Sequence, residues 1–201
     1  METLWPDAEG DVAHQSLSTT LHRLRRLLGN EETIQRQEGK LTVNPRHCWV
    51  DVWAVERGLS RAEAVAAQSQ SDGEMWAEME KLVDKATALY QGPFLAKEDF
   101  SWANEVIDRV QRRMVRALRQ IGRHHEQDSA WDKAIDCYER AIQVAPCTEE
   151  LYRRLIAIYQ QQGRRSEALG VYERCRRTLF NQMGLAPSRE TEALYHSLRS
   201  A

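Results

Sequence analysis

Long apolar stretches are missing from this chain of 201 residues. No segment approaches the roughly 18 consecutive apolar residues that a membrane-spanning helix needs. The N-terminal end also lacks the short apolar core of a secretion signal. These absences predict a soluble, cytoplasmic protein without a membrane partner.

Cysteines are few, and an excess of one charge is absent. The four cysteines, Cys48, Cys137, Cys147 and Cys175, have neither metal-ligand spacing nor the pattern of a small disulfide-bonded domain. We therefore expect reduced thiols that act as small apolar residues. Because 28 basic and 30 acidic residues give a formal net charge of -2, any contact with nucleic acid must be local.

Catalytic motifs are also missing. The chain has no Walker phosphate loop, GxGxxG, GxSxG or HExxH motif. The segment 124–128, HHEQD, resembles the HHxxxDG acyltransferase motif, but its aspartate comes one residue early and Ser129 replaces the glycine. His124 and Asp128 have i, i+4 spacing, yet no third metal ligand is evident nearby. We predict a polar helix end here, and no enzyme activity, cofactor or metal.

A repeat of thirty-four residues is the clearest positive signal. The segment 133–140, KAIDCYER, returns as EALGVYER at 167–174, which is the tetratricopeptide period. Sixteen positions before Ala134 and Ala168, the apolar residues of a preceding helix correspond as well, so the pattern predicts two antiparallel helical hairpins. The expected core positions of this repeat are Leu118, Ile121, Ala134, Tyr138, Ala141, Tyr152, Leu155, Ala168 and Tyr172.

The second unit departs from the first. Cys175 stands where Ala141 stood, and the last helix continues until Gly184 and Pro187. A further helix at 191–198 is expected to cap the array. Upstream, apolar spacing predicts helices at 52–68, 75–90 and 102–126, the last with a core stripe that includes Val110 and Met114.

The first fifty residues have a different pattern. Leucines 17, 21, 24 and 28 form one stripe of a helix at 13–28, and Gly29 follows as a stop signal. The opposite face is polar and basic. Two short runs around a glycine at 33–43 predict a β-hairpin.

This N-terminal segment resembles the C-terminal half of an OmpR-type winged-helix domain. The resemblance lies in LWPD at 4–7, HRLRRLLG at 22–29 and the hairpin that follows. It implies that the arginine-rich helix enters the DNA major groove and that the hairpin forms the wing. By position, the implied DNA-binding residues are Thr19, Thr20, His22, Arg23, Arg25 and Arg26, with Arg36 or Lys40 in the wing. An ordinary surface helix with solvated arginines is the alternative.

The remaining three quarters of the chain resembles the bacterial transcriptional activator domain. The resemblance lies in VDVW at 50–53, LYQGPFL at 89–95, Trp102, GRRSEAL at 163–169 and MGLAPS at 183–188. In the SARP group of regulators this domain follows an OmpR-type winged helix, which matches the order found here. The family resemblance implies self-association and contacts that support transcription.

The expected fold is mainly α: tetratricopeptide-like helical hairpins at 49–201, and a helix plus β-hairpin remnant of a winged helix at 1–48. The strands and first helix of the winged helix have no counterpart before Leu4. We favour the interpretation that the chain is part of a longer regulator, whose complete form binds DNA; otherwise Met1 is a natural start and the winged helix is vestigial.

Two functional hypotheses remain. The first is the C-terminal part of a transcriptional regulator with DNA and protein partners. The second is a protein-binding repeat scaffold that does not bind DNA. Because a lone helix with an uncovered leucine stripe is marginal in water, we expect residues 1–45 to fray, to dock on the helical domain, or to pair in a homodimer.

Overall fold

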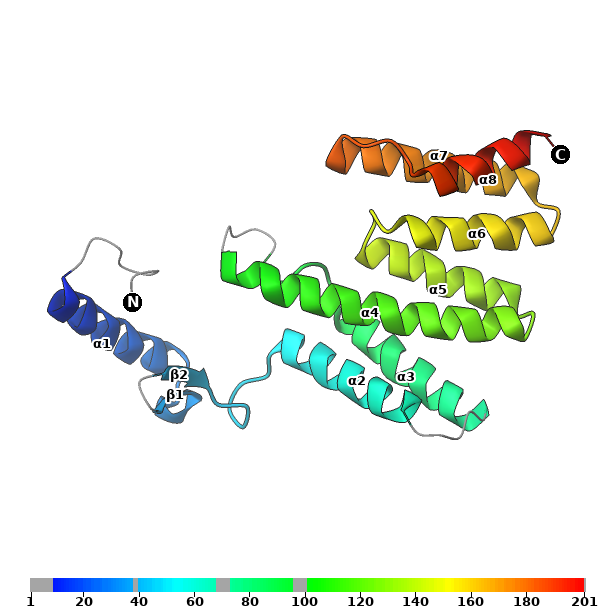
Figure 1. The fold of residues 1–201 in the computed structure, drawn as a ribbon. Coiled ribbons are helices and arrows are strands. Elements are labelled where there is room, and N and C mark those ends of the chain that lie inside the picture. The colour runs from blue at the N-terminus through cyan, green and yellow to red at the C-terminus, as the bar shows by residue number, and fades with distance from the viewer. Residues whose placement is uncertain (1–8, 38–39, 68–72, 96–100, 201) are drawn as a thin grey trace. The chain divides into compact units, whose positions relative to one another are not determined.

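The computed structural model describes residues 9–37, 40–67, 73–95 and 101–200 (Figure 1). The chain forms two compact units, Met1–Asp51 and Val52–Ala201. The described residues are mainly helical, as predicted, with one two-stranded sheet. None of their helices has the length and apolar composition to cross a membrane.

The first unit contains the predicted helix and hairpin. Helix α1 spans Gly10–Leu27, and Gly29 follows it with a left-handed φ of 71°. After a short 3-10 turn at Glu31–Thr33, strands β1 (Ile34–Gln37) and β2 (Lys40–Val43) pair antiparallel. The glycine turn expected between the strands lies outside the described residues.

A small set of contacts holds this unit together. The Arg25 guanidinium of α1 donates from Nε and Nη2 to the carbonyl of Ile34, at 3.0 and 2.6 Å. The backbone N–H of Asn44 donates to the carbonyl of Thr33 at 2.8 Å, which closes the open end of the hairpin. Ala13, Thr33 and Ile34 are buried. The core of this unit is therefore small, and polar contacts supplement it.

The second unit is built from helices alone among its described residues. The predicted helices are confirmed, with ends that shift by at most a few residues. Their bounds are α2 Asp51–Ala66, α3 Gly73–Leu89, α4 Ser101–Gln127, α5 Trp131–Val144, α6 Glu149–Gln161, α7 Arg165–Met183 and α8 Arg189–Ser200. One continuous apolar core runs from α2 to α8.

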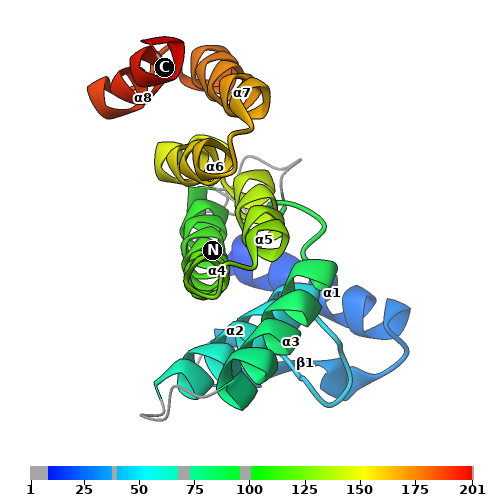
Figure 2. The ribbon, with the colours of Figure 1, turned by 90° about the vertical axis from the view of Figure 1, so that its right-hand side faces the viewer.

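The helices of this unit lie in two rows. Figure 2 shows α4, α6 and α8 on one side and α5 and α7 on the other. Ion pairs connect α5 to two other helices: Arg140 of α5 binds Asp84 of α3, and Arg174 of α7 binds Glu139 of α5, both at 2.7 Å. Arg140 and Arg174 are themselves thirty-four residues apart, so the repeat period includes surface contacts as well as core positions.

The period extends to the turns. Ser129 after α4 and Gly163 after α6 both have a left-handed backbone, with φ of 57° and 70°. The next residue in each turn donates its N–H five residues back, Ala130 to His125 and Arg164 to Tyr159, both at 2.8 Å. This bond satisfies a carbonyl that the helix end leaves free. The same backbone turn thus reverses the chain in both hairpins.

The nine predicted repeat-core residues are all buried, and Tyr138 is one of the three tyrosines among them. Its ring lies against Gly122, in the C-terminal third of α4. A Cβ placed on Gly122 would stand 2.9 Å from Cζ of the Tyr138 ring, closer than real Cβ contacts allow. The Tyr138 hydroxyl donates to Glu126, also on α4, so the ring cannot shift without losing this bond. Burial, and then this bond, raise the pKa of Tyr138.

Two of the cysteines are also part of this core. Cys137 and Cys175 are buried, and burial raises the pKa of each thiol to about 12. Thiolate is the reactive form of cysteine, so these two side chains are unreactive at neutral pH. All four cysteines are free thiols.

The contact between Gly122 and Tyr138 predicts that one methyl group added at Gly122 lowers the stability of the helical unit. Alanine favours a helix over glycine, but in Gly122→Ala the new methyl would collide with a ring that has no free space. We expect the free energy of unfolding to fall by about 1 to 3 kcal/mol, measured by urea denaturation.

Gly170 is the matched control, because it lies within α7 and an added Cβ there meets no atom within 4 Å. Gly170→Ala should leave stability unchanged or raise it by up to about 1 kcal/mol. Equal effects of the two substitutions would contradict the packing argument.

Candidate nucleic-acid interface and protein-binding face

The polar side of α1 is exposed and basic. Thr19, His22, Arg23 and Arg26 lie on one face of the helix at three- and four-residue spacing, and all four are exposed. Thr20 is also exposed, nearer the edge of this face. The structure therefore leaves these five predicted DNA-binding side chains accessible.

Arg25 has a different position. Its guanidinium is partly buried and uses two of its nitrogens to bind the Ile34 carbonyl of β1. Arg25 sits at the boundary between the basic face and the leucine stripe, where a long side chain can reach back to the hairpin. This contact gives Arg25 a structural role, the joining of α1 to β1.

The candidate wing presents two cations near its tip. Arg36 and Lys40 are both exposed, and Lys40 begins β2 opposite Gln37. Their positions leave them free to approach a phosphate.

The leucine stripe of α1 is incompletely covered. Leu17 and Leu21 are half-buried, whereas Leu24 and Leu28 are 42% and 48% exposed. Exposed leucines at helical spacing favour contact with a further apolar surface.

In the second unit, arginines of α4 bind carboxylates on α2 and α6. Toward α2, Arg109 binds Glu56 at 2.8 Å, and Arg113 binds Glu63 at 2.8 Å and the Ser60 hydroxyl. The hydrogen bond and charge of Arg113 outweigh burial and hold the pKa of Glu63 below its ordinary value. These arginine contacts thus hold α2 to α4.

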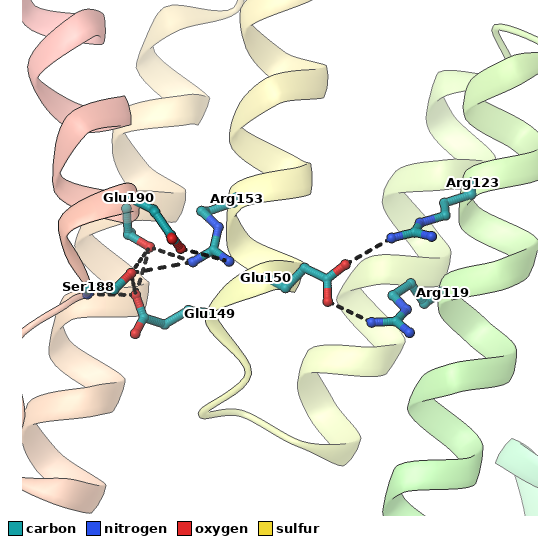
Figure 3. A network of polar contacts seen from close by, with 8 residues as sticks. Arg119, Arg123, Glu149, Glu150, Arg153, Ser188 and Glu190 are labelled. Carbon is teal, nitrogen blue, oxygen red and sulfur yellow. Dashed lines mark hydrogen bonds and ion pairs between the residues drawn. The ribbon is translucent and has the colours of Figure 1, made fainter.

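Two adjacent glutamates at the start of α6 point to opposite neighbours (Figure 3). Glu150 binds Arg119 at 2.6 Å and Arg123 at 3.1 Å, both on α4. Glu149 instead accepts hydrogen bonds from Ser188, at its N–H and hydroxyl, and from the Thr191 hydroxyl at 2.7 Å. The first turn of α6 therefore connects α4 with α8.

Both glutamates are held in the ionised form. Burial raises the pKa of Glu150, but the charges and hydrogen bonds of its arginines outweigh burial and lower it. Burial likewise opposes the ionisation of Glu149, and the bonds from Thr191 and Ser188 again lower its pKa. Carboxylates in the first turn of α6 also interact favourably with the positive end of its helix dipole.

The residues that resemble an acyltransferase motif lie at the C-terminal end of α4. His124 stacks on Trp76 with ring centroids 4.4 Å apart and lies 3.4 Å from Asp128. His125 is buried, with Nε2 3.4 Å from Glu80 of α3. The described residues contain no group of three potential metal ligands. These histidines are thus engaged in packing and polar contacts at a helix end.

Sequence reasoning missed Gly122 and the arginine pairs of α4. A signal for Gly122 was present: a glycine inside a long predicted helix costs about 1 kcal/mol relative to alanine, which suggests a close contact. The arginine pairs had no comparable signal, because their partners are 27 to 53 residues away in the sequence.

The two glutamates predict an acid-sensitive structure. A carboxyl whose pKa is lowered by folding stabilises the fold above its unfolded pKa of about 4.3, and this stabilisation is lost as the pH falls through the lowered value. The double variant Glu149→Gln, Glu150→Gln should be less stable than the parent near pH 7, and the difference should narrow below about pH 4. Thermal unfolding across this pH range measures both effects.

Glu173→Gln is the control, because the ion pair of Glu173 with Arg176 is exposed. Its stability curve should run parallel to that of the parent. A parallel curve for the double variant would show that Glu149 and Glu150 do not contribute.

Two known proteins resemble the chain along nearly its whole length. The Regulatory protein AfsR of Streptomyces griseus is 23% identical over 208 residues, which cover 100% of this chain and 20% of that protein. The chain therefore spans about a fifth of the length of this relative. The solved structure of Mycobacterium tuberculosis EmbR, in complex with a low-affinity phosphopeptide, is 22% identical and covers 99% of this chain and 53% of that one. Its TM-score of 0.62 shows that the two folds are similar.

The match to a protein family is more specific. Residues 50–199 match the bacterial transcriptional activator domain, and this range contains all of helices α2 to α7 and all of α8 except its last residue. The chain belongs to the bacterial transcriptional activator domain family.

Proposed function

We propose that the chain is the C-terminal part of a bacterial transcriptional regulator that binds DNA through its first unit. In this proposal α1 enters the major groove with His22, Arg23 and Arg26, while Arg36 and Lys40 of the hairpin approach the phosphate backbone. The observation that carries the proposal is the exposed basic face of α1, followed by a β-hairpin and then by a domain of this regulatory family.

The helical unit has the second role in this proposal. It binds another copy, another domain or the transcription machinery. The side of α4 that carries Arg112 and Arg116, here called its outer side, is exposed. Helical repeats commonly use such a side for protein contacts. The alternative is a protein-binding scaffold without DNA binding, and the experiment below separates the two.

Arginine substitutions in α1 test the DNA contact. Each phosphate contact removed should lower the magnitude of the log–log salt slope by about one unit. We expect Arg23→Ala and Arg26→Ala each to weaken DNA binding by the full-length protein and to reduce this slope. Fluorescence anisotropy of labelled duplex DNA at increasing salt concentration gives both quantities.

Arg177→Ala is the matched control, since Arg177 is an exposed arginine of α7. It should change neither affinity nor slope. If Arg23→Ala and Arg26→Ala also leave both unchanged, the scaffold alternative replaces the DNA-binding proposal.

The leucine stripe supports a proposal of self-association. Leu24 and Leu28 leave an apolar surface on α1 that a second copy could cover in a symmetric homodimer. We expect light scattering of this chain to give the mass of a dimer, and the double variant Leu21→Glu, Leu24→Glu to give that of a monomer. Equal masses for the two proteins would argue against pairing through α1.

A further inference from the structure

The outer side of α4 contains a pocket that the proposed DNA contact does not use. It has a volume of about 320 Å³ and lies between α4 and the turn that joins α5 to α6. The residues that line it are Asp108, Gln111, Arg112, Val115, Arg116, Arg119, Ala145 and Thr148.

Two arginines of this pocket have little or no acidic partner. Arg112 is 71% exposed and reaches only Asp108, at 4.0 Å, a distance that contributes little in water. Arg116 is exposed and makes no ion pair or hydrogen bond with any residue that the structure describes, although its charge helps to lower the pKa of Glu63. Both guanidinium groups are therefore available to a partner.

The local charge balance is positive. The charged residues that line the pocket are three arginines, Arg112, Arg116 and Arg119, and one carboxylate, Asp108. Glu150 is already bound by Arg119 and Arg123, which leaves Arg112 and Arg116 as the principal uncompensated charges. A positive surface of this kind attracts carboxylates or phosphates.

The apolar residues of the pocket distinguish between these two partners. Val115 and Ala145 provide an apolar lining beside the arginines. An apolar side chain of a protein segment can fill such a space, whereas the phosphate backbone of DNA cannot.

We infer that this pocket is a docking site for an acidic protein segment, in which an apolar side chain lies against Val115 and Ala145 while flanking carboxylates bind Arg112 and Arg116. Arginine suits this role because its planar guanidinium binds a carboxylate through two parallel hydrogen bonds. The inference rests on the proposed protein-binding role of the helical unit and identifies the chemistry of its partner.

A peptide-binding experiment tests the site. The probe is a fluorescein-labelled peptide with two leucines among aspartates and glutamates, and its counterpart has asparagine and glutamine at the acidic positions. We expect the full-length protein to bind the acidic peptide and not the neutral one. The double variant Arg112→Glu, Arg116→Glu should lower the affinity at least about tenfold.

The matched control reverses two exposed charges on α7, Arg176→Glu and Arg177→Glu, and should bind the acidic peptide like the parent. Equal binding of the two peptides, no binding of either, or unchanged affinity in the Arg112, Arg116 variant would overturn the inference. So would a loss of duplex DNA binding in that variant with no effect on the peptide.

The outcome of this peptide-binding experiment is independent of the outcome of the DNA-binding experiment. Arg23→Ala tests α1, and Arg112→Glu, Arg116→Glu test α4. Either proposal can therefore fail while the other stands.

Discussion

The close contact between Gly122 and Tyr138 is the constraint on which the helical unit depends. The missing side chain on α4 makes room for an aromatic ring of α5, and the hydroxyl of that ring binds Glu126. Glu126 also lies 3.6 Å from Arg154 of α6, so Glu126 links α4 with both α5 and α6. With one side of α4 fixed in the core, its opposite side is free to carry a row of arginines. The packing of the repeat thus determines where the charged surface can form.

Charge is used differently in the two units. On α1, Arg23 and Arg26 remain exposed, a pattern suited to contact with the phosphates of DNA. On α4, Arg109, Arg113, Arg119 and Arg123 are paired closely with carboxylates, whereas Arg112 reaches Asp108 at 4.0 Å and Arg116 has no ion pair among the described residues. Pairing keeps most of this charge structural and concentrates the free charge beside an apolar pocket. This difference favours separate partners for the two units.

The sequence predicted what depends on periodicity. Apolar spacing and the period of thirty-four residues identified the helices and core positions such as Leu118 and Tyr172, because burial on one face repeats regularly along a helix. Contacts with distant or irregular partners were not predictable. Arg25 matches its neighbours in composition but binds a carbonyl of β1, and adjacent Glu149 and Glu150 point to different helices. Only the tertiary structure determines such choices.

The central functional claim is that DNA contact and protein contact belong to different units of one regulator. The most direct measurement compares genomic occupancy, by chromatin immunoprecipitation, with transcript levels of the occupied genes in cells that express each variant. Arg23→Ala should lower both occupancy and transcription. Arg112→Glu, Arg116→Glu should lower transcription while occupancy stays at the level of the parent. If occupancy and transcription fall together in the second variant, the two functions are not separate and the claim is wrong.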